Sequence, residues 1–166
     1  MTRTGLMIDL AREDIGKIKY LLGAKLGPGD LPLHPNVDCS GAIHRWVERA
    51  LLAAPLDMVT VMQGGVGVLI PTQKFLARFH GSANQGDLCR HIPLTVALGP
   101  TGAGCFLFMR PSVGGHGHVA LSLGWGKTIE SRGGAGVCEV GPFTNLRRKW
   151  DYAGKVDSLF LEVGAR

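Results

Sequence analysis

Hydrophobic residues recur at helical spacing in two segments near the beginning of the chain. In residues 4–22, leucines and isoleucines fall near a 3.6-residue period with charged residues between them, which predicts an amphipathic helix that stops at Gly23. In residues 39–54, an apolar stripe predicts a second helix, which Pro55 ends. The polar side of this helix comprises His44, Arg45, Glu48 and Arg49. Asp38 is a good N-cap for it, because its carboxylate can accept from unpaired N–H groups of the first turn.

From about residue 105 onward, the pattern changes to short runs that alternate or are wholly apolar. These runs predict strands at residues 105–109, 119–123, 127–130, 137–140 and 159–163. Gly124-Trp125-Gly126 separates two of them and is typical of a tight hairpin turn. The two strands beside this turn are therefore expected to be antiparallel neighbours.

The remaining segments carry a weaker pattern. Residues 24–37 hold three prolines and predict a loop. Residues 57–70 predict a strand or a hairpin, residues 71–79 a short helix, and residues 81–104 a loop-rich segment with one short strand. Helices that come first and a meander of strands that follows indicate an α+β fold with an antiparallel sheet, in a single domain over residues 1–166.

Composition narrows the possible partners. The 25 glycines cluster without a fixed period, which fits many tight turns and argues against collagen and repeat arrays. A net charge of +5 suits an acidic polymer, nucleic acid or an anionic membrane, and equally a solvated surface with no charged partner. The densest basic run, residues 147–150, is short, and no known nucleic-acid-binding motif is present. We therefore expect no nucleic-acid partner.

Neither a leader nor a membrane span is predicted. Charged residues interrupt the N-terminal segment, so it lacks the apolar region of a signal peptide. No stretch approaches the roughly 18 apolar residues of a membrane helix, so no membrane insertion is expected. The four cysteines include no CxxC pair, which argues against a zinc site or a redox centre. No metal or other cofactor is expected.

Cys39 lies in the predicted first turn of the second helix. Unpaired N–H groups and the positive end of the helix dipole stabilise a thiolate there, so the thiol can become a nucleophile. The alternative is a buried cysteine that packs as a small hydrophobic side chain. We interpret Cys89, Cys105 and Cys138 in that second way, since two of them lie in apolar strand runs.

His118 is the best candidate for a base. It begins a predicted strand, and the hairpin turn should bring Glu130 back to nearly the same level, where a carboxylate can hold the second imidazole nitrogen. His116 would project to the same face. Taken separately, His118 also fits a surface histidine and Glu130 a solvated carboxylate. The other histidines, including His116, are interpreted as structural or solvated: His34, His44, His80 and His91.

Two motifs together resemble the NlpC/P60 cell-wall cysteine peptidases. The first is Asp-Cys-Ser-Gly at residues 38–41, which opens a helix, and the second is His-Val-Ala-Leu-Ser-Leu-Gly-Trp-Gly at residues 118–126. The third polar residue of the family falls on Glu130. Upstream, Tyr20 and Gly23 match part of a Tyr-x-Trp-Gly-Gly motif, in which Leu22 and Ala24 replace the tryptophan and the second glycine. A Gly-Asp-Leu element has become Gly-Cys-Phe at 104–106, and residues 55–104 show little match.

The resemblance implies a papain-like α+β fold with N-terminal helices packed on an antiparallel sheet. It implies Cys39 as nucleophile, His118 as general base and acid, and Glu130 as the residue that orients His118. Tyr20, Asp38 and Ser40 are implied on the oxyanion or substrate side, with the Cys39 N–H as a further oxyanion donor. The implied substrate is the peptide stem of bacterial peptidoglycan, cleaved at an amide bond without a metal or cofactor.

Other functions fit the same residues. A papain-like acyltransferase or transglutaminase would pass the acyl group to an amine or alcohol instead of water, and a non-catalytic module would only bind wall peptides. Without a leader, the protein is expected to reach the cell wall or periplasm as a phage lysin, a tail-associated enzyme or an effector of a secretion system. We expect a monomer, with an immunity protein or a phage structural protein as possible partners.

Overall fold

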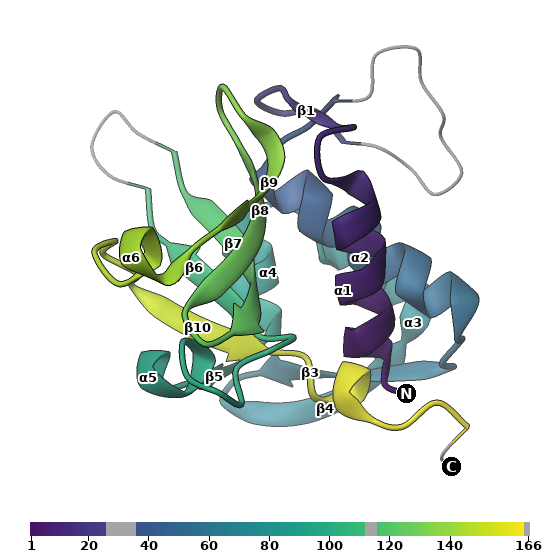
Figure 1. Ribbon diagram of the computed structural model, residues 1–166. Helices are drawn as coiled ribbons and strands as arrows, with labels where there is room; N and C mark the ends of the chain where they lie inside the picture. Colours follow the sequence, from purple (N-terminus) through teal and green to yellow (C-terminus); the bar gives the residue numbers. More distant parts are fainter. Residues whose placement is uncertain (26–35, 112–115, 165–166) are drawn as a thin grey trace.

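A six-stranded antiparallel sheet forms the centre of the computed structural model, which describes residues 1–25, 36–111 and 116–164 (Figure 1). The strands lie in the order β5 (Arg90–Ile92), β10 (Tyr152–Lys155), β6 (Phe106–Met109), β7 (His118–Gly124), β8 (Lys127–Arg132) and β9 (Gly136–Val140). The predicted α+β fold with an antiparallel sheet is confirmed.

Two helices cover one face of this sheet. Helix α2 (Cys39–Ala53) packs on β7 and β8, and α1 (Arg3–Asp14) packs on α2 (Figure 1). Ile43 and Trp46 of α2 are fully buried, in the same core cluster as Val119 and Leu121 of β7. The N-terminus of α2 therefore lies beside the strands that carry the predicted site.

The opposite face of the sheet is also covered. Ala120 and Leu107 face a second, smaller cluster with Trp150 and with Ala97 of α5 (Leu94–Ala97). Alternate residues of β7 thus enter different clusters, as strand geometry requires. Because both faces of β6 and β7 are buried, the sequences of these strands are nearly continuous apolar runs.

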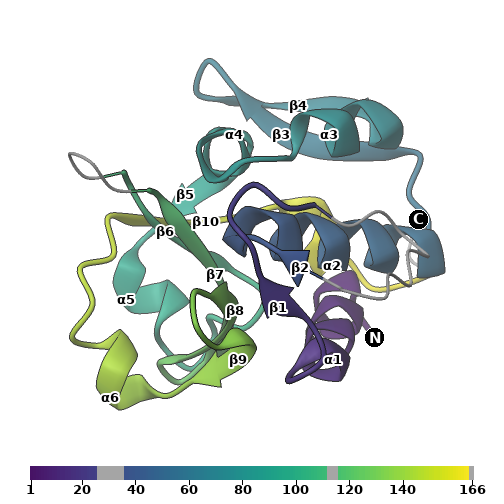
Figure 2. The same ribbon diagram turned by 90° about the horizontal axis from the view of Figure 1, so that it is seen from above.

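A second group of elements lies beside the helical layer. Residues 57–70 form the hairpin of β3 (Met58–Gln63) and β4 (Val66–Pro71), which was one of the two predicted alternatives. Helices α3 (Thr72–Arg78) and α4 (Ser82–Leu88) pack against this hairpin (Figure 2). The short helix predicted at residues 71–79 is confirmed.

Helix α2 starts as predicted, but one residue of its predicted polar side, Arg45, is buried. The Asp38 side chain accepts from the Gly41 N–H, which confirms the predicted N-cap. Arg45 was expected to face solvent and is only 7% exposed. Its Nε donates to Asp14 at 3.0 Å, and the indole of Trp46 donates to the same oxygen at 2.8 Å. Arg45 and Asp14 thus fix the packing of α1 on α2.

The first helix is shorter than predicted. Helix α1 ends at Asp14, and Gly16 has a φ of 74°, which a helix does not allow. The chain then forms β1 (Lys19–Tyr20), which pairs in parallel with β2 (Asn36–Val37). Ile18 accepts a backbone hydrogen bond from Val137, so this segment lies along the outer edge of β9. Most of the loop predicted at 24–37, including His34, lies outside the described residues.

Two predictions for the later chain are wrong. Residues 81–104 were expected to be loop-rich with one short strand; β5 is that strand, but the segment also contains α4 and α5, helices that are too short for periodicity to reveal. Residues 159–163 were expected to form a strand. The 3-10 helix η1 (Asp157–Phe160) ends within this segment instead, and Leu159 enters the main core.

Strand β10 was not predicted, because Gly154 interrupts its pattern. A Cβ at Gly154 would lie 2.5 Å from the Cβ of Cys89, so only glycine fits where β10 crosses the end of α4. The remaining helix, α6 (Pro142–Asn145), follows β9 directly. No helix in the described part of the chain is both long and apolar enough to cross a membrane.

The hairpin between β7 and β8 forms as predicted. Gly124, Trp125 and Gly126 have φ values of 79°, 56° and 75°, so the turn uses left-handed backbone at three consecutive residues. Ser122 pairs with Thr128 across the two strands. This register determines which side chains of β7 and β8 meet.

Candidate active site

Cys39 is the first residue of α2 and is almost fully buried. Its Sγ lies 3.8 Å from the carbonyl oxygen of Gly117, the residue before His118. The thiol therefore sits at the positive end of a 15-residue helix and beside the start of β7. This is a position at which a thiolate is stabilised.

The glycine of the Asp-Cys-Ser-Gly motif has a steric role. A Cβ at Gly41 would lie 2.7 Å from the Asp38 Oδ1 and 2.7 Å from the carbonyl oxygen of Ala24. The Gly41 N–H donates to that same Oδ1 at 2.6 Å. Glycine thus allows the Asp38 cap and the backbone at Ala24 to approach the first turn that presents Cys39.

His118 and Glu130 are brought together by the register of β7 and β8. Both lie an even number of residues from the Ser122–Thr128 pair, so their side chains share one face of the sheet. The His118 Nε2 and the Glu130 Oε1 are 3.0 Å apart. Because Nε2 is used by Glu130, Nδ1 is the ring nitrogen left for Cys39.

Glu130 is a fully buried carboxylate with cationic partners. Arg148 donates from both terminal nitrogens, at 2.5 Å to Oε1 and 2.8 Å to Oε2, and the Thr128 hydroxyl donates to Oε2 at 2.8 Å. Burial would raise the pKa of Glu130, but hydrogen bonds from Arg148 and His118 lower its pKa to about 2. Glu130 is therefore ionised at neutral pH.

The environment of His118 favours its protonated form. Burial would lower the pKa of His118, but hydrogen bonding to Cys39 and to Glu130, together with their charges, raises its pKa to about 9. The Trp150 ring stacks near the imidazole, with centroids 6.2 Å apart. A protonated imidazole is the group with which cysteine peptidases pair their nucleophilic sulfur.

Tyr20 lies on the other side of the site. Its burial, with the negative charges of Cys39 and Asp38, raises the pKa of its phenol. A groove of about 330 Å³ opens here, and its lining residues are Tyr20, Met109, His118, Ser131, Arg132, Gly133 and Arg148. Tyr20 and His118 thus line one groove, while Cys39 and Glu130 are buried and are not among its lining residues.

Asp38 and Ser40 are placed differently from Tyr20. Both are buried, and Lys25 forms an ion pair with Asp38 and donates to the Ser40 hydroxyl at 3.1 Å. The Ser40 carbonyl oxygen accepts from the Gln85 side chain of α4 at 2.8 Å. These contacts hold the first turn of α2 in place, and neither Asp38 nor Ser40 lines the groove.

Arg148 is the functional residue that the sequence did not reveal. It lies in the basic run at 147–150, which reads as surface charge, yet its guanidinium binds Glu130 and lies 5.0 Å from the centre of the Trp150 ring. Asn145 supports this arrangement, because its side-chain Nδ2 donates to the Thr128 hydroxyl and its Oδ1 accepts from Arg148. Only the three-dimensional position of Glu130 identifies these partners.

The remaining described histidines are either exposed or contact other groups. His116 and His80 are exposed, and His44 lies 2.9 Å from the Leu76 carbonyl oxygen, as expected for solvated and structural residues. His91 stacks on Tyr152. Cys89 and Cys105 are buried as predicted, whereas Cys138 is only partly buried.

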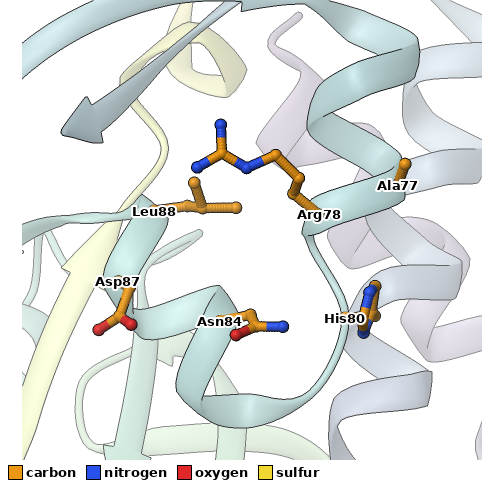
Figure 3. A pocket seen from close by; sticks show the side chains of 6 residues that line it. All are labelled: Ala77, Arg78, His80, Asn84, Asp87 and Leu88. Carbon is orange, nitrogen blue, oxygen red and sulfur yellow. The ribbon is translucent and has the colours of Figure 1, made fainter.

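A separate cavity of about 260 Å³ is lined by residues of α3, of α4 and of the segment between them (Figure 3). The side chains around it are Ala77, Arg78, His80, Asn84, Asp87 and Leu88. None of them is a thiol, and five of the six are exposed. Within the described ranges, no three His, Cys, Asp or Glu side chains are grouped as metal ligands would be.

Comparisons with known proteins agree on the fold. No protein-family profile and no curated protein matches the chain. The P60 domain of an antigen from M. avium subspecies paratuberculosis is 25% identical, with a TM-score of 0.57 over 93% of this chain and 94% of that one.

Two longer proteins are similar over 93% of this chain. They are NlpC1 from Trichomonas vaginalis, 16% identical with a TM-score of 0.59, and the peptidoglycan hydrolase RipB from Mycobacterium tuberculosis, 22% identical with a TM-score of 0.55. The match spans 44% and 64% of their lengths. The resemblance seen in the two motifs is thus confirmed in three dimensions, and the chain has the NlpC/P60 fold.

Proposed function

We propose that this protein is a cysteine peptidase that hydrolyses amide bonds in the peptide stems of bacterial peptidoglycan. The observation that carries the proposal is an imidazole, His118, that interacts with both the Cys39 thiol and the buried Glu130 carboxylate. The choice of substrate is supported by a structural neighbour, RipB, which is a peptidoglycan hydrolase. The basic net charge also suits an acidic wall polymer.

Acylation begins from the thiolate–imidazolium pair. The Cys39 sulfur attacks the carbonyl carbon of the scissile amide, and the carbonyl oxygen becomes an oxyanion. In this proposal the backbone N–H of Cys39 and the Tyr20 hydroxyl stabilise that oxyanion. The imidazolium of His118 donates its Nδ1 proton to the amide nitrogen, the C–N bond breaks, and a thioester on Cys39 remains.

Deacylation reverses the proton transfer. Neutral His118 accepts a proton from a water molecule as the water oxygen attacks the thioester carbonyl. The C–S bond breaks, the carboxylic acid product leaves, and the thiolate–imidazolium pair is restored. Glu130 does not touch the substrate in this scheme; it fixes the tautomer and the orientation of His118 and stabilises its positive charge.

The cellular setting is a further part of the proposal. Because peptidoglycan lies outside the cytoplasmic membrane, we propose that the enzyme acts in the wall or periplasm after delivery by a phage or a secretion system. An immunity protein or a phage structural protein would be its partner in those two settings.

Digestion of purified peptidoglycan tests the activity. Mass spectrometry of the soluble products should show new free carboxyl and amino termini at one amide position, and Cys39→Ala should release none. Products joined to an added amine would indicate acyl transfer instead. Binding of the protein to peptidoglycan without any release by the wild type would show a non-catalytic module and would overturn the proposal.

A further inference from the structure

Three large apolar side chains are exposed where the turn between β7 and β8 meets α6. Trp125, Phe143 and Leu146, here called the apolar patch, have 71%, 72% and 68% of their surface exposed. The Asn145 side chain of α6 donates to the Gly126 carbonyl oxygen at 2.8 Å, so the turn and α6 are in direct contact. The catalytic histidine begins β7 and the turn follows its other end, roughly 20 Å away along the strand. The proposed reaction therefore does not account for this patch.

Trp125 has a backbone conformation that bulky residues rarely adopt. Its φ is 56°, in the left-handed region that favours glycine and asparagine. Its N–H donates to the Gly99 carbonyl oxygen at 2.9 Å, which fixes the turn against the segment that follows α5. The other two tryptophans of the chain, Trp46 and Trp150, are buried, whereas this indole is exposed. A large aromatic side chain that is strained and unburied is a mark of a contact made outside the chain.

Positive charge predominates around the apolar patch. Four cations and no Asp or Glu occur in the segments that meet there, residues 94–104, 123–129 and 140–149. Three of these cations are exposed, namely Lys127, Arg147 and Lys149, and exposed Glu139 lies one residue outside the segments. The Arg147 guanidinium lies 4.1 Å from the centre of the Phe143 ring, so one cation adjoins the apolar surface directly. A partner that complements this corner is both apolar and anionic.

The size of the apolar patch favours a lipid surface over a protein. Even at about 200 Å² for each side chain, the patch offers roughly 600 Å². Each partner in a stable protein interface buries about 800 Å². A bilayer sets no such minimum, because aromatic and leucine side chains settle among the headgroups while lysine and arginine meet the phosphates. Contact of this kind needs no membrane-spanning segment.

We propose that the apolar patch and its three exposed cations dock the protein on an anionic lipid surface. The inference goes beyond the proposed function and does not depend on it. Tyr20, His118 and Ser131 line the groove at the opposite end of β7 and β8 from the turn. Docking through the turn and α6 therefore leaves the groove accessible.

Sedimentation of the full-length protein with lipid vesicles tests the docking. Vesicles of phosphatidylglycerol and phosphatidylcholine in equal parts provide the anionic surface, and vesicles of phosphatidylcholine alone are the neutral reference. The protein should sediment with the anionic vesicles at low salt, and far less with neutral vesicles or at high salt. Binding should also shift the tryptophan fluorescence to the blue. That shift reports on Trp125, because Trp46 and Trp150 are already buried.

Trp125→Asn separates the ring from the fold. Asparagine suits the left-handed backbone, so the turn should form without the ring. The substitution should weaken binding to anionic vesicles about tenfold and remove the fluorescence shift. Leu69→Thr on β4 is the matched control, because Leu69 is also exposed and lies outside the patch. It should leave vesicle binding unchanged.

A second pair of variants tests the charges. Lys149→Gln should weaken binding about fivefold at low salt, as expected for one cation near an anionic surface. Lys74→Gln removes the same charge from α3 and should leave binding unchanged. Equal binding by the wild type and Trp125→Asn would overturn the proposal, and so would equal effects of the two lysine substitutions. Failure of the wild type to bind either vesicle would also overturn it, and an acidic protein would then be the partner that fits this corner.

Discussion

The Glu130 carboxylate, which has no exposed surface, shares its Oε1 between the imidazole of His118 at 3.0 Å and the guanidinium of Arg148 at 2.5 Å. Burying a carboxylate costs desolvation free energy that a single partner offsets poorly. Hydrogen bonds to both a cation and an imidazole offset more of that cost. The same oxygen that orients the proposed base is therefore itself held by a second residue.

Loss of the nucleophile or the base should stop hydrolysis without unfolding the protein. Cys39→Ala and His118→Ala should each lower turnover of peptidoglycan by at least about a thousandfold, since residues that act as a unit lose most of the rate together. Circular dichroism should show unchanged helix content and a similar melting temperature. Turnover by Cys39→Ala at the wild-type rate would exclude the mechanism.

Substitution of Glu130 should change the pH dependence of the rate. The charge of Glu130 contributes to the raised pKa of His118, about 9, so neutralising it should lower that pKa. The alkaline limb of kcat/KM, on which the imidazolium is lost, should then move to lower pH. Glu130→Gln keeps an acceptor oxygen and should cost less activity than Glu130→Ala. If neither variant alters the rate or the profile, His118 is oriented by another residue.

Arg148 should stabilise the folded protein through its ion pair with Glu130. Arg148→Met leaves a buried carboxylate without its cation, and breaking a buried ion pair costs about 3–5 kcal/mol in unfolding free energy. Arg148→Lys keeps the charge but not the fork, and should lie between Arg148→Met and the wild type. Chemical denaturation measures these differences.

The matching control for Arg148 is a double-mutant cycle. Adding Glu130→Gln to Arg148→Met removes the uncompensated charge and should restore part of the lost stability. Additive losses in the two single variants would contradict a direct coupling between Glu130 and Arg148.

A methyl group at Gly41 should disturb the first turn of α2. Gly41→Ala places a Cβ 2.7 Å from two oxygens, including the Asp38 cap, and should cost about 1–3 kcal/mol in unfolding free energy. Gly141→Ala is the control, because nothing lies within 4 Å of a Cβ there and its φ of −81° suits any residue. Equal stabilities of the two variants would show that the contact at Gly41 relaxes freely.

Stability should fall at both ends of the pH range. Glu130 has a pKa of about 2 in the fold against 4.5 when unfolded, so its contribution is complete above pH 4.5 and is lost as the pH falls toward 2. His118 has a pKa of about 9 against 6.5, so its contribution is complete below pH 6.5 and is lost as the pH rises toward 9. Melting temperatures of wild type and His118→Ala across this range measure the second effect.

The sequence was most informative where a local pattern determines a local structure. The Asp38 cap, the α2 stripe and the turn at 124–126 were all predicted, because each depends on a few neighbouring residues. The contact of His118 with Glu130 followed from the same turn, since it sets the register. The motifs then indicated the fold that the comparisons confirm.

Long-range partners were not predictable in the same way. Arg148 and Arg45 were read as surface charges, because nothing in their neighbourhoods along the chain indicates a buried carboxylate. The two helices between residues 81 and 104, α4 and α5, have seven and four residues, too few to show a clear helical period of hydrophobic residues. Strand β10 was missed because tertiary packing against Cys89 selects a glycine within it.

The segment that carries Tyr20 also closes an edge of the sheet. Gly16 and Ile18 exchange backbone hydrogen bonds with Val137, so the outer side of β9 is occupied, and the opposite edge strand, β5, has only three residues. Exposed strand edges template self-association, and short or covered ones do not. The piece of chain that supplies one wall of the groove thus also makes edge-to-edge aggregation of the sheet less favourable.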